Sequence, residues 1–441
     1  MKNWMLVGAA IAALAISPVP AFAAATPRVA VPVVASAAPT TDVVSSFYAQ
    51  RRNAPLWLKA GAQSSAATEF LQVLQRAPLD GLSNGPALAN QAQGLLARAS
   101  TGDQAAAADA ERLLSTAWVM YVQALQRAPA GMTYADNWVK PHLSTPGQIL
   151  SRAASAPSLS AHIREVSAVN PIYARLRDAA WSNMQMTGAP ADPRVLASLD
   201  RVRDMPFQKR YVMVDTAGAQ LYMIEDGQIV DTMRVIVGKV DPSTQTPMLA
   251  STIYYATLNP YWHVTDELVR NLIARNVINQ GVGYLKTRGY QVMPATAGDD
   301  TLLDPAKVNW RAVAAGDEQV RVRQLPGPMN SMGQLKIGFP NADDIYLHDT
   351  PSKGLFAQDD RNLSHGCVRL EDAERLGRWL LGRDPQSAST SDPEQHVLLP
   401  TPVPIYMTYV TAQVNDGKLS YVDDIYGRDN AHASQVATLA N

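Results

Sequence analysis

The hydrophobic period of the chain changes once, near Arg210, and this change limits the folds that are open to it. Before Arg210, apolar residues recur at three- and four-residue spacing, as from Gln104 to Arg127, which indicates amphipathic helices. After it, Arg210 to Asp215 alternates, and Gln220 to Val237 holds two strand-like runs joined at Asp226-Gly227, which predicts a hairpin. We therefore expect an α+β chain, with a helical region followed by a mostly β domain, a sandwich.

Further segments of each kind follow the same division. Helical patterns also cover Ala66 to Gln75, Ile163 to Asp178 and the connector Arg194 to Arg203. Strand patterns also cover Ser251 to Thr257, Leu335 to Phe339, Ile345 to Leu347, Val403 to Thr411, and Leu419 to Val422 after the turn at Asn415-Asp416-Gly417. The strand rhythm is interrupted between Trp262 and Val320, where Asp266 to Ile278 is expected to be helical. An insert of this length is either a lid over a binding site or disordered decoration.

The domain organisation follows from these patterns, because 441 residues exceed one ordinary domain. An Ala/Pro/Val tract at 24–41 is expected to be a linker, and residues 42–190 a helical scaffold domain. Residues 207–427 would then form the β domain, with 265–320 as its lid or capping insert and 428–441 as a tail.

The N-terminus has the features of a secretory signal peptide. Lys2 is followed by the apolar run Met5 to Ile16, and Ala21-Phe22-Ala23 is a cleavage pattern, so residues 1–23 are expected to be removed. An uncleaved anchor is the alternative, but the run is short for a span of about 20 residues. We expect an exported protein with no membrane span after cleavage.

The charge balance excludes some partners. The formal net charge is −1, with both signs interspersed, whereas a nucleic-acid binder would carry a basic surplus. Nothing in this balance suggests a polybasic membrane-surface protein.

Cys367 is the only cysteine of the chain. In an exported protein, structural cysteines come in pairs, so an unpaired one suggests a reactive thiol. A buried cysteine acting as a small hydrophobe is the plainer alternative. A zinc site with His348 and His365 is another, although no close ligand pair of the usual kind accompanies them. A redox thiol would normally bring a second cysteine.

The surroundings of Cys367 favour nucleophilic catalysis. His348 ends a buried-strand pattern and could act as base, while the turn His365-Gly366-Cys367 could supply backbone N–H groups to an oxyanion. A helical pattern from Glu371 to Leu381 follows. We therefore predict a thiol just ahead of a helix N-terminus, with a pKa below the usual range.

This stretch resembles the signature of L,D-transpeptidase (YkuD-type) catalytic domains: a histidine, fifteen intervening residues, then Ser364-His365-Gly366-Cys367. The resemblance extends to the larger YcbB-like branch, which carries a helical scaffold domain. The segments that carry it include 233–239, Thr246-Pro247, 259–264, 326–330, 339–341, His348-Asp349-Thr350-Pro351 and Asp424-Ile425-Tyr426. Two features depart from the family pattern: Arg369 stands where many members have asparagine, and there is no room for a peptidoglycan-binding module.

The resemblance implies roles for individual residues. Cys367 would be the nucleophile and His348 the base, with the backbone carbonyl of Asp349 orienting the imidazole. The amides of His365, Gly366 and Cys367 would form the oxyanion hole, and the His365 side chain would shape that turn. The residues expected to contact substrate are Tyr346, Ser364, Arg369, Trp262 and His263, the last two as part of a lid.

The resemblance also implies an activity, without cofactor or metal. The enzyme would cleave a peptidoglycan tetrapeptide stem after diaminopimelate, release D-alanine, and pass the acyl group to an amine of a second stem. A 3-3 cross-link is the default and a 1-3 link needs no other residues. Carbapenems should trap the thioester. The expected location is the periplasm of a Gram-negative bacterium, with stem peptides and cell-wall synthases as partners. A carboxypeptidase, a cross-link hydrolase, a protein-anchoring enzyme and a non-catalytic wall-binding protein remain alternatives.

Overall fold

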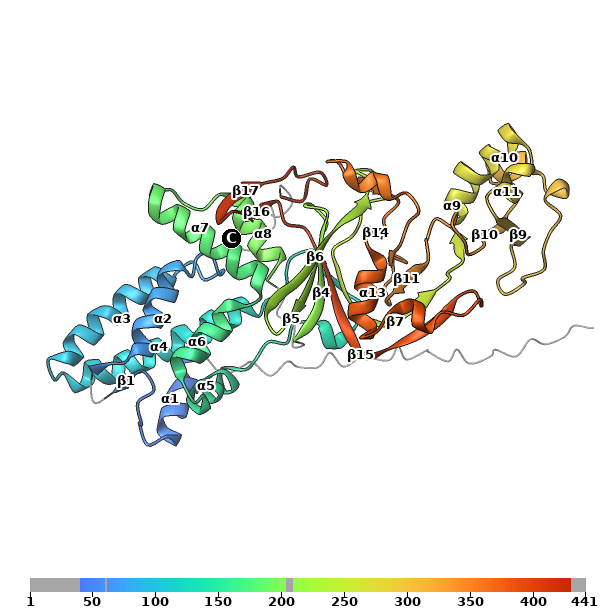
Figure 1. Cartoon of the computed structure of the whole chain (residues 1–441). Coiled ribbons are helices and arrows are strands. Elements are labelled where there is room, and N and C mark those ends of the chain that lie inside the picture. Colours follow the sequence, from blue (N-terminus) through green and yellow to red (C-terminus); the bar gives the residue numbers. More distant parts are fainter. Residues whose placement is uncertain (1–39, 60–61, 204–208, 430–441) are drawn as a thin grey trace, which may run out of the picture. The chain divides into compact units, whose positions relative to one another are not determined.

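The computed structural model describes residues 40–59, 62–203 and 209–429 (Figure 1). The expected signal peptide at 1–23 and most of the expected linker at 24–41 lie outside the described residues. Within them, the chain is helical as far as Arg201 and mostly β from Arg210 on, as the change of period predicted. None of the helices that the structure describes combines the length and apolar character needed to span a membrane.

The helical region has an aromatic core. Trp57 stacks on Phe70 with ring centroids 5.1 Å apart, and Trp118 meets Phe70 edge-on at 5.3 Å. The run expected from Gln104 forms the longest helix and buries Trp118 completely. The helices are α1 (Thr40–Gln50), α2 (Ser65–Arg76), α3 (Gly85–Ser100), α4 (Gln104–Leu125), α5 (Pro146–Ser155), α6 (Leu159–Ala168), α7 (Pro171–Thr187) and α8 (Pro193–Arg201), with short strands β1 (Leu58–Lys59), β2 (Ala62–Gln63) and β3 (Thr133–Tyr134) and the 3-10 turn η1 (Asn137–Val139).

A buried carboxylate ties the segment after α1 to α4. The amides of Leu56, Trp57 and Leu58 donate to Glu111 at 2.7–2.9 Å. Tyr48 Oη donates to Glu111 Oε2 at 2.6 Å. Glu111 is only 7% exposed, so these donors replace the water that its charge would otherwise need.

The prediction of a single helix from Ile163 to Asp178 is wrong, because the range contains the end of α6 and the beginning of α7. Val169 adopts a positive φ of 62°, and the Asn170 side chain caps the amides of Ile172 and Tyr173. Pro171 then takes the first helical position. An Asn-Pro pair of this kind begins a new helix, since proline has no N–H to continue the previous one.

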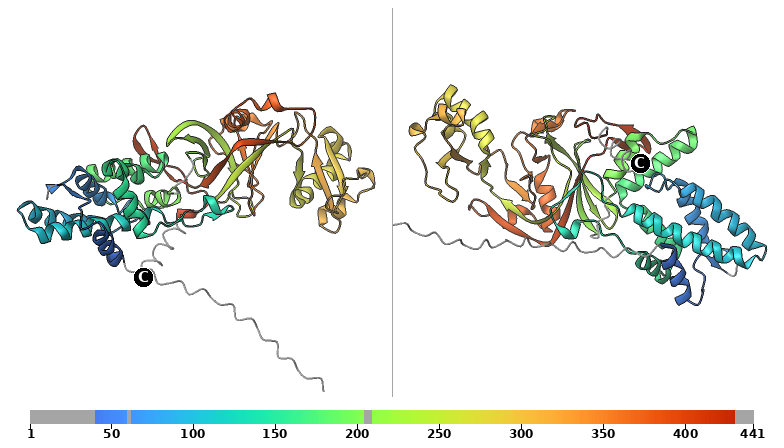
Figure 2. Two further views of the ribbon diagram at one scale, coloured as in Figure 1. Left: turned by 90° about the horizontal axis from the view of Figure 1, so that it is seen from below. Right: turned by 180° about the vertical axis from the view of Figure 1, so that it is seen from behind.

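The β domain is one sheet that closes on itself (Figures 1 and 2). Each strand pairs with the next in the order β7-β11-β12-β14-β6-β5-β4-β15, and β15 pairs with β7 again. The mostly β domain that was expected is present, and its hydrogen bonding continues around the edge because β11 pairs with β12 on one side and with β7 on the other. The strands are β4 (Arg210–Asp215), β5 (Gln220–Glu225), β6 (Gln228–Gly238), β7 (Leu249–Leu258), β11 (Leu335–Gly338), β12 (Leu347–His348), β13 (Asn362–Ser364), β14 (Val368–Leu370) and β15 (Gln395–Thr408).

The inside of the ring is the core of this domain. Alternation places Val212 and Val214 of β4 inside it, whereas Tyr211 and Met213 pack with the helical region. The amphipathic helix α13 (Ala373–Leu381) fills the same core with Leu376 and its apolar neighbours. The remaining elements are the hairpin β16 (Ala412–Asn415) and β17 (Lys418–Tyr421), and the 3-10 turns η4 (Lys353–Ala357) and η5 (Pro385–Ala388).

The insert is folded, which excludes the alternative of disordered decoration. It has its own sheet, ordered β8-β10-β9, and a separate core that includes Ile273, Leu285 and Trp310. Because β8 and β10 belong to it, it extends beyond the expected 265–320 on both sides. Its elements are β8 (Trp262–Val264), α9 (Asp266–Leu268), the π-helical turn η2 (Val269–Ala274), α10 (Arg275–Gln280), α11 (Gly283–Thr287), β9 (Tyr290–Pro294), η3 (Pro305–Lys307), α12 (Trp310–Ala315) and β10 (Val320–Gln324).

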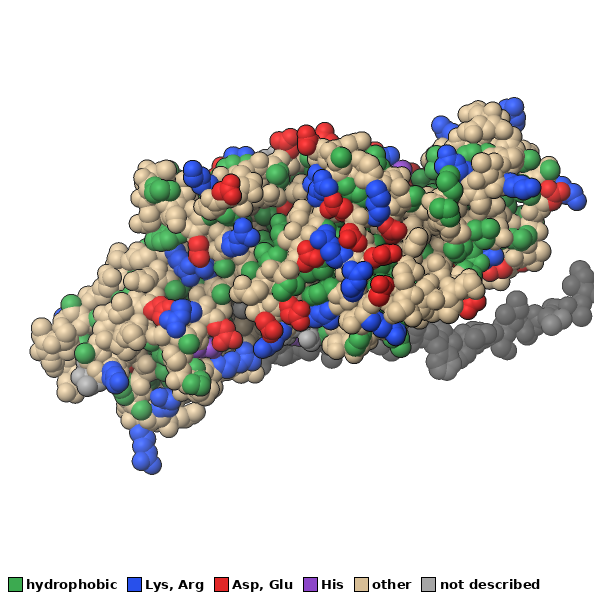
Figure 3. Space-filling view, viewed as in Figure 1, with side chains coloured by type: hydrophobic (Ala, Val, Ile, Leu, Met, Phe, Trp, Pro, Cys, Tyr) green, Lys and Arg blue, Asp and Glu red, His purple; other side chains and the backbone are tan. Residues whose placement is uncertain are grey.

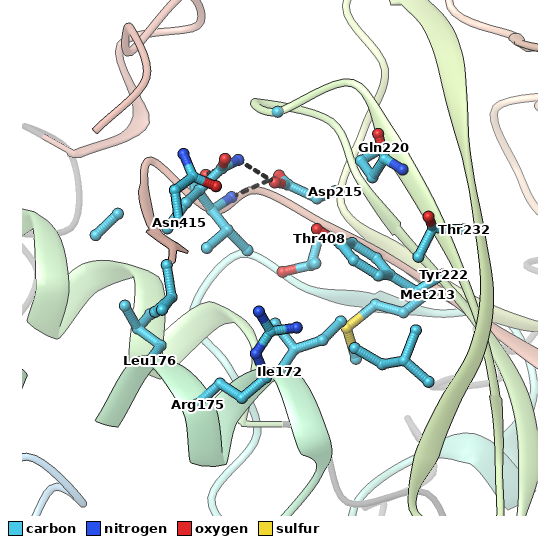
Figure 4. Close-up of a pocket in the computed structure, with 16 residues that line it drawn as sticks. Ile172, Arg175, Leu176, Met213, Asp215, Gln220, Tyr222, Thr232, Thr408 and Asn415 are labelled. Atoms are coloured by element: carbon cyan, nitrogen blue, oxygen red, sulfur yellow. Dashed lines mark hydrogen bonds between the residues drawn. The ribbon is translucent and has the colours of Figure 1, made fainter. Parts of the chain in front are cut away.

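A cavity of about 290 Å³ lies where α7, the hairpin and the outer face of β4 and β5 meet (Figure 4). Asp215 is 2% exposed and accepts hydrogen bonds from the amides of Ala217 and Val410 and from the Gln413 side chain. A Cβ at Gly218 would lie 2.1 Å from Gln413 Nε2 and 2.6 Å from Asp215 Oδ2, so a larger residue there would displace these two side chains. Asp215 therefore joins the hairpin to β4.

Charged side chains of both signs are interspersed over the face that Figure 3 shows. This distribution matches the formal net charge of −1. The visible face presents no large single-sign surface of the kind that attracts nucleic acid.

Candidate active site

The register of two parallel strands brings the predicted catalytic residues to one face of the ring. In β12 and β14, Leu347 lies opposite Val368 and His348 lies opposite Arg369. Leu347 and Val368 are fully buried in the core. Because side chains alternate along a strand, their neighbours must lie on the outer face. Those neighbours are Tyr346, His348, Cys367 and Arg369.

The imidazole of His348 is buried and held in one orientation. Its Nδ1 lies 2.6 Å from the carbonyl oxygen of Asp349, and since a carbonyl can only accept, Nδ1 is the protonated nitrogen. Burial, together with the nearby guanidinium of Arg369, lowers the pKa of His348 to about 3. The ring is therefore neutral at physiological pH, with a lone pair on Nε2.

Asp349 is itself fixed by three neighbours. Its amide donates to Leu335 O at 2.8 Å, and its carboxylate accepts from the amide of Gln334 at 3.0 Å and from Lys353 Nζ at 2.7 Å. Lys353 Nζ also donates to the carbonyl of Glu371 at 2.7 Å. Lys353 thus joins the chain just after β12 to the chain just after β14, next to the base.

Cys367 is half-buried, and its thiol lies 3.8 Å from the carbonyl oxygen of Asp344. Burial raises the pKa of this thiol, although a hydrogen bond from Tyr346 opposes the shift. The predicted low pKa is therefore wrong in direction. The reason is that α13 begins only at Ala373, so β14 separates the thiol from the helix N-terminus that was expected to stabilise its thiolate.

The turn before Cys367 is braced from within. Gly366 has a φ of 114°, a conformation open to glycine, and a Cβ there would lie 3.1 Å from Ile345 Cδ1. Ser364 Oγ donates to Cys367 O at 2.6 Å and accepts from the amide of Gly366 at 3.2 Å. Ser364 is 2% exposed and both of these contacts lie within the turn, so its expected contact with substrate stays a prediction.

The backbone N–H groups of this turn are not equivalent. The amide of Gly366 is engaged by Ser364 Oγ. For the amides of His365 and Cys367, no hydrogen-bond acceptor lies within reach in the described part of the chain. Of the three expected oxyanion donors, these two are available to a substrate.

The side chain of His365 lies beside Lys239. It is exposed, and its Nε2 lies 3.4 Å from Lys239 Nζ. Partial burial and the charge of Lys239 lower the pKa of His365. This position agrees with a residue that shapes the turn.

Arg369 and Lys336 add positive charge around His348 and the thiol of Cys367. Burial lowers the pKa of Arg369, and no carboxylate among the described residues pairs with its guanidinium. Lys336 lies opposite His348 on β11, with its Nζ 4.1 Å from the ring centroid of Tyr346. Sequence reasoning missed Lys336, although its place between two buried residues of a predicted strand put it on the outer face.

Two further residues, Thr246 and Tyr426, connect the turn and the end of β6 by hydrogen bonds. Thr246 Oγ1 donates to Gly366 O at 2.7 Å and accepts from the amide of Gly238 at 2.8 Å. Tyr426 Oη donates to Gly238 O at 2.6 Å. Both lie in segments that the resemblance included without a role.

Trp262 and His263 lie in the insert. The Trp262 ring is 6.2 Å from that of Tyr290, within the insert core. His263 Nε2 lies 3.1 Å from Glu394 Oε1. No contact of either residue with Cys367 occurs among the described residues, so their expected place above a substrate stays a prediction.

Over residues 40–59, 62–203 and 209–429, no three histidine, cysteine or carboxylate side chains are grouped closely enough to hold a metal ion. The zinc alternative required His348, His365 and Cys367 to converge on one point. The imidazole of His365 instead lies beside Lys239.

Comparison with known proteins identifies two domains. The model of the L,D-transpeptidase catalytic domain, YkuD, matches residues 209–405, and that of the Scaffold domain matches residues 42–179. A protein of Haemophilus influenzae named "Putative L,D-transpeptidase" is 25% identical over 409 residues, which are 88% of this chain and 78% of that protein.

Solved L,D-transpeptidase structures align with part of the chain. One from Mycobacterium smegmatis is 13% identical, with a TM-score of 0.23, over 45% of this chain and 58% of that one. L,D-transpeptidase 3 from Mycobacterium tuberculosis, in complex with a faropenem-derived adduct, is 14% identical, with a TM-score of 0.23, over 45% and 60%. The chain thus spans less than two thirds of these proteins. On its family matches, the chain carries a YkuD-family L,D-transpeptidase catalytic domain preceded by a Scaffold domain.

Proposed function

We propose that the chain is an exported peptidoglycan L,D-transpeptidase that cross-links stem peptides through a thioester on Cys367. The observation that carries this proposal is the pairing of β12 with β14. It sets Cys367 on the same outer face as His348, whose Nδ1 is fixed by the Asp349 carbonyl. A nucleophile beside a base that a third group orients is the arrangement that acyl transfer requires.

In the first step, Nε2 of His348 takes the thiol proton as the sulfur attacks the carbonyl carbon of the third stem residue, diaminopimelate. A C–S bond forms as the carbonyl π electrons move to oxygen and make it an oxyanion. This intermediate then collapses: the carbonyl re-forms, the C–N bond to D-alanine breaks, and His348 gives the proton to the leaving amine. Because burial raises the pKa of Cys367 and His348 is neutral, the resting pair is uncharged. Deprotonation would therefore accompany the attack and not precede it.

The oxyanion formed in this step would lie at the amides of His365 and Cys367. Both N–H groups lack acceptors among the described residues, so they can donate without first breaking another bond. The charges of Arg369 and Lys336 would favour the negative charge as it develops. Arg369 would also contact a carboxylate of the substrate, because its guanidinium is unpaired within the described chain.

In the second step, an amine of an acceptor stem attacks the thioester. His348 accepts the amine proton, the new amide bond forms and the C–S bond breaks, and His348 then gives its proton to the sulfur to restore the thiol. The folded insert would exclude water from the thioester if it closes over the donor, which would favour the amine over hydrolysis. The acceptor position, and hence a 3-3 or 1-3 link, is decided by the experiment below.

Mass spectrometry of the mature protein with purified disaccharide-tetrapeptide tests the proposal, with Cys367→Ala as the matched control. A cross-linked dimer and free D-alanine from the wild type alone would support it, and fragmentation would identify the acceptor position. Formation of tripeptide without dimer would indicate a carboxypeptidase instead of a cross-linking enzyme. Unchanged substrate, with no carbapenem adduct on Cys367, would overturn the enzymatic function.

A further inference from the structure

The helical domain contains a cavity of about 180 Å³ that the proposed chemistry does not use. Helices α4, α5 and α6 contribute to its wall, together with the segments that follow α4 and α8. It lies in the domain that precedes the catalytic ring. The residues that line it are Trp118, Val122, Leu125, Gln126, Arg127, Pro141, His142, Ile149, Arg152, His162, Val166 and Arg203.

The lining combines apolar and basic side chains and includes no aspartate or glutamate. Trp118 and Ile149 give it an apolar floor and are 0% and 3% exposed. Arg127 and Arg152 are exposed at its edge. Next to it, Leu143 leaves 64% of its surface in solvent. Such a lining suits a ligand that has an apolar body and a negative charge.

Two of the three arginines of this lining, Arg127 and Arg152, form no ion pair with a carboxylate of the described residues. The closest contact of Arg152 is Nη1 to Ser144 Oγ at 3.4 Å, and Arg127 Nη2 donates to the carbonyl of Gly81 at 3.0 Å. No ion pair of either arginine occurs among the described residues; Arg203, by contrast, pairs with Asp200. Two guanidinium groups at one opening thus have no ion-pair partner within the described chain, although the charge of Asp200 acts on Arg127 at longer range.

The cations also repel one another. Partial burial lowers the pKa of Arg127 and the charge of Arg203 lowers it further, while the charge of Asp200 opposes the shift. Partial burial also lowers the pKa of His162, whose ring lies 5.7 Å from that of Trp118; the charge of Glu165 opposes this shift and the charge of Arg152 adds to it. Like charges gathered around a low-dielectric cavity cost stability, and a bound anion would remove that cost.

We propose that this cavity is an accessory site that binds a short peptide through a free carboxylate held by Arg152 and Arg127. The planar guanidinium group matches a carboxylate with two parallel hydrogen bonds, and the apolar floor accepts a side chain of alanine size. The identity of the occupant rests on the proposed function. On that basis the natural occupant is a peptidoglycan stem, which carries several carboxylates. Such a site would give the helical domain a contact of its own with the wall.

Titration of Cys367→Ala with the free tetrapeptide tests this site without turnover. The indole N–H signal of Trp118 is a local reporter, because Trp118 lines the cavity, and it can be assigned among eight tryptophans with Trp118→Phe. We expect a saturable shift, and we expect Arg152→Gln to raise the dissociation constant about tenfold. Arg98→Gln is the matched control, since Arg98 is an exposed arginine of the same domain that pairs with Asp103.

Each outcome decides between possibilities. A tetrapeptide with amidated carboxylates should leave the Trp118 signal unchanged, and an equal shift from it would overturn the proposal. Octyl phosphate is the competing probe: binding of octyl phosphate without the peptide would assign the site to a phosphate-bearing amphiphile instead. If no probe shifts the Trp118 signal, the proposal of a binding site in this cavity is refuted. Because catalysis is measured separately on the wild type, these results are independent of whether cross-linking is found.

Discussion

His348 and Arg369 lie opposite each other on adjacent parallel strands, and the charge of Arg369 helps to keep the imidazole neutral. The base and the residue that we assign to substrate recognition are therefore electrostatically coupled. A bound carboxylate would neutralise Arg369 and raise the proton affinity of His348 at the moment when a proton must be taken. This coupling can be measured through pH dependence.

We predict that acylation of Cys367 by a carbapenem is nearly independent of pH between 5 and 7. The pKa of His348 is about 3, so the base stays neutral throughout this range, whereas an ordinary histidine would become protonated. In Arg369→Gln the acid limb should move to higher pH, because removal of a positive charge favours the imidazolium. Rates followed by mass spectrometry test this. A tenfold fall of the wild-type rate from pH 7 to 5 would contradict it.

Lys353 should be a positioning residue. In Lys353→Met the carboxylate of Asp349 loses its 2.7 Å partner, which frees the carbonyl that fixes His348 Nδ1. We expect acylation to slow roughly tenfold to a hundredfold, and the ¹⁵N shifts of His348 should show a mixture of tautomers. Lys353→Arg should restore part of both. The control is Lys209→Met, which removes a lysine from an exposed pair with Asp226. An unchanged tautomer in Lys353→Met would refute the role.

Ser364→Ala tests the internal brace of the nucleophile turn. Its hydroxyl holds Cys367 O and the amide of Gly366, so its loss should free the turn while the ring of strands stays intact. We expect acylation to fall about tenfold or more with a melting temperature close to that of the wild type. If Ser364 instead contacted substrate, the variant would change substrate affinity and leave carbapenem acylation unaltered.

The sequence was sufficient for the main elements, because these depend on local patterns, and the hairpin of β5 and β6 formed as its turn predicted. Residue type and spacing supplied Cys367 and His348 as candidates for a catalytic pair, and their roles stay a prediction. Ring closure could not be found in this way, since it depends on β11 pairing with strands far away in sequence. The predicted low pKa of the Cys367 thiol was wrong. Burial raises this pKa, and the strand β14 separates the thiol from the N-terminus of α13.

Two smaller features, the strands of the insert and the break between α6 and α7, were also not predicted from local sequence patterns. The strands β8, β9 and β10 are three to five residues long, so their alternation is too brief to stand out from loop sequence. The break between α6 and α7 had a visible signal in Asn170-Pro171. The apolar spacing on both sides continued across it and outweighed that signal.

The stability of the helical domain should depend on Glu111. In Glu111→Gln the charge that accepts three backbone amides is lost, and one side-chain oxygen becomes an NH₂ group that cannot accept. We expect a loss of about 2–4 kcal/mol in unfolding free energy, measured by urea denaturation of the mature protein. Glu69→Gln is the control, because Glu69 pairs with the exposed Arg164 and such surface pairs contribute about 1 kcal/mol or less. Equal losses in the two variants would mean that the buried carboxylate is no more important than a surface one. Carbapenem acylation of the folded variant should be unchanged, since none of the contacts of Glu111 reaches the ring.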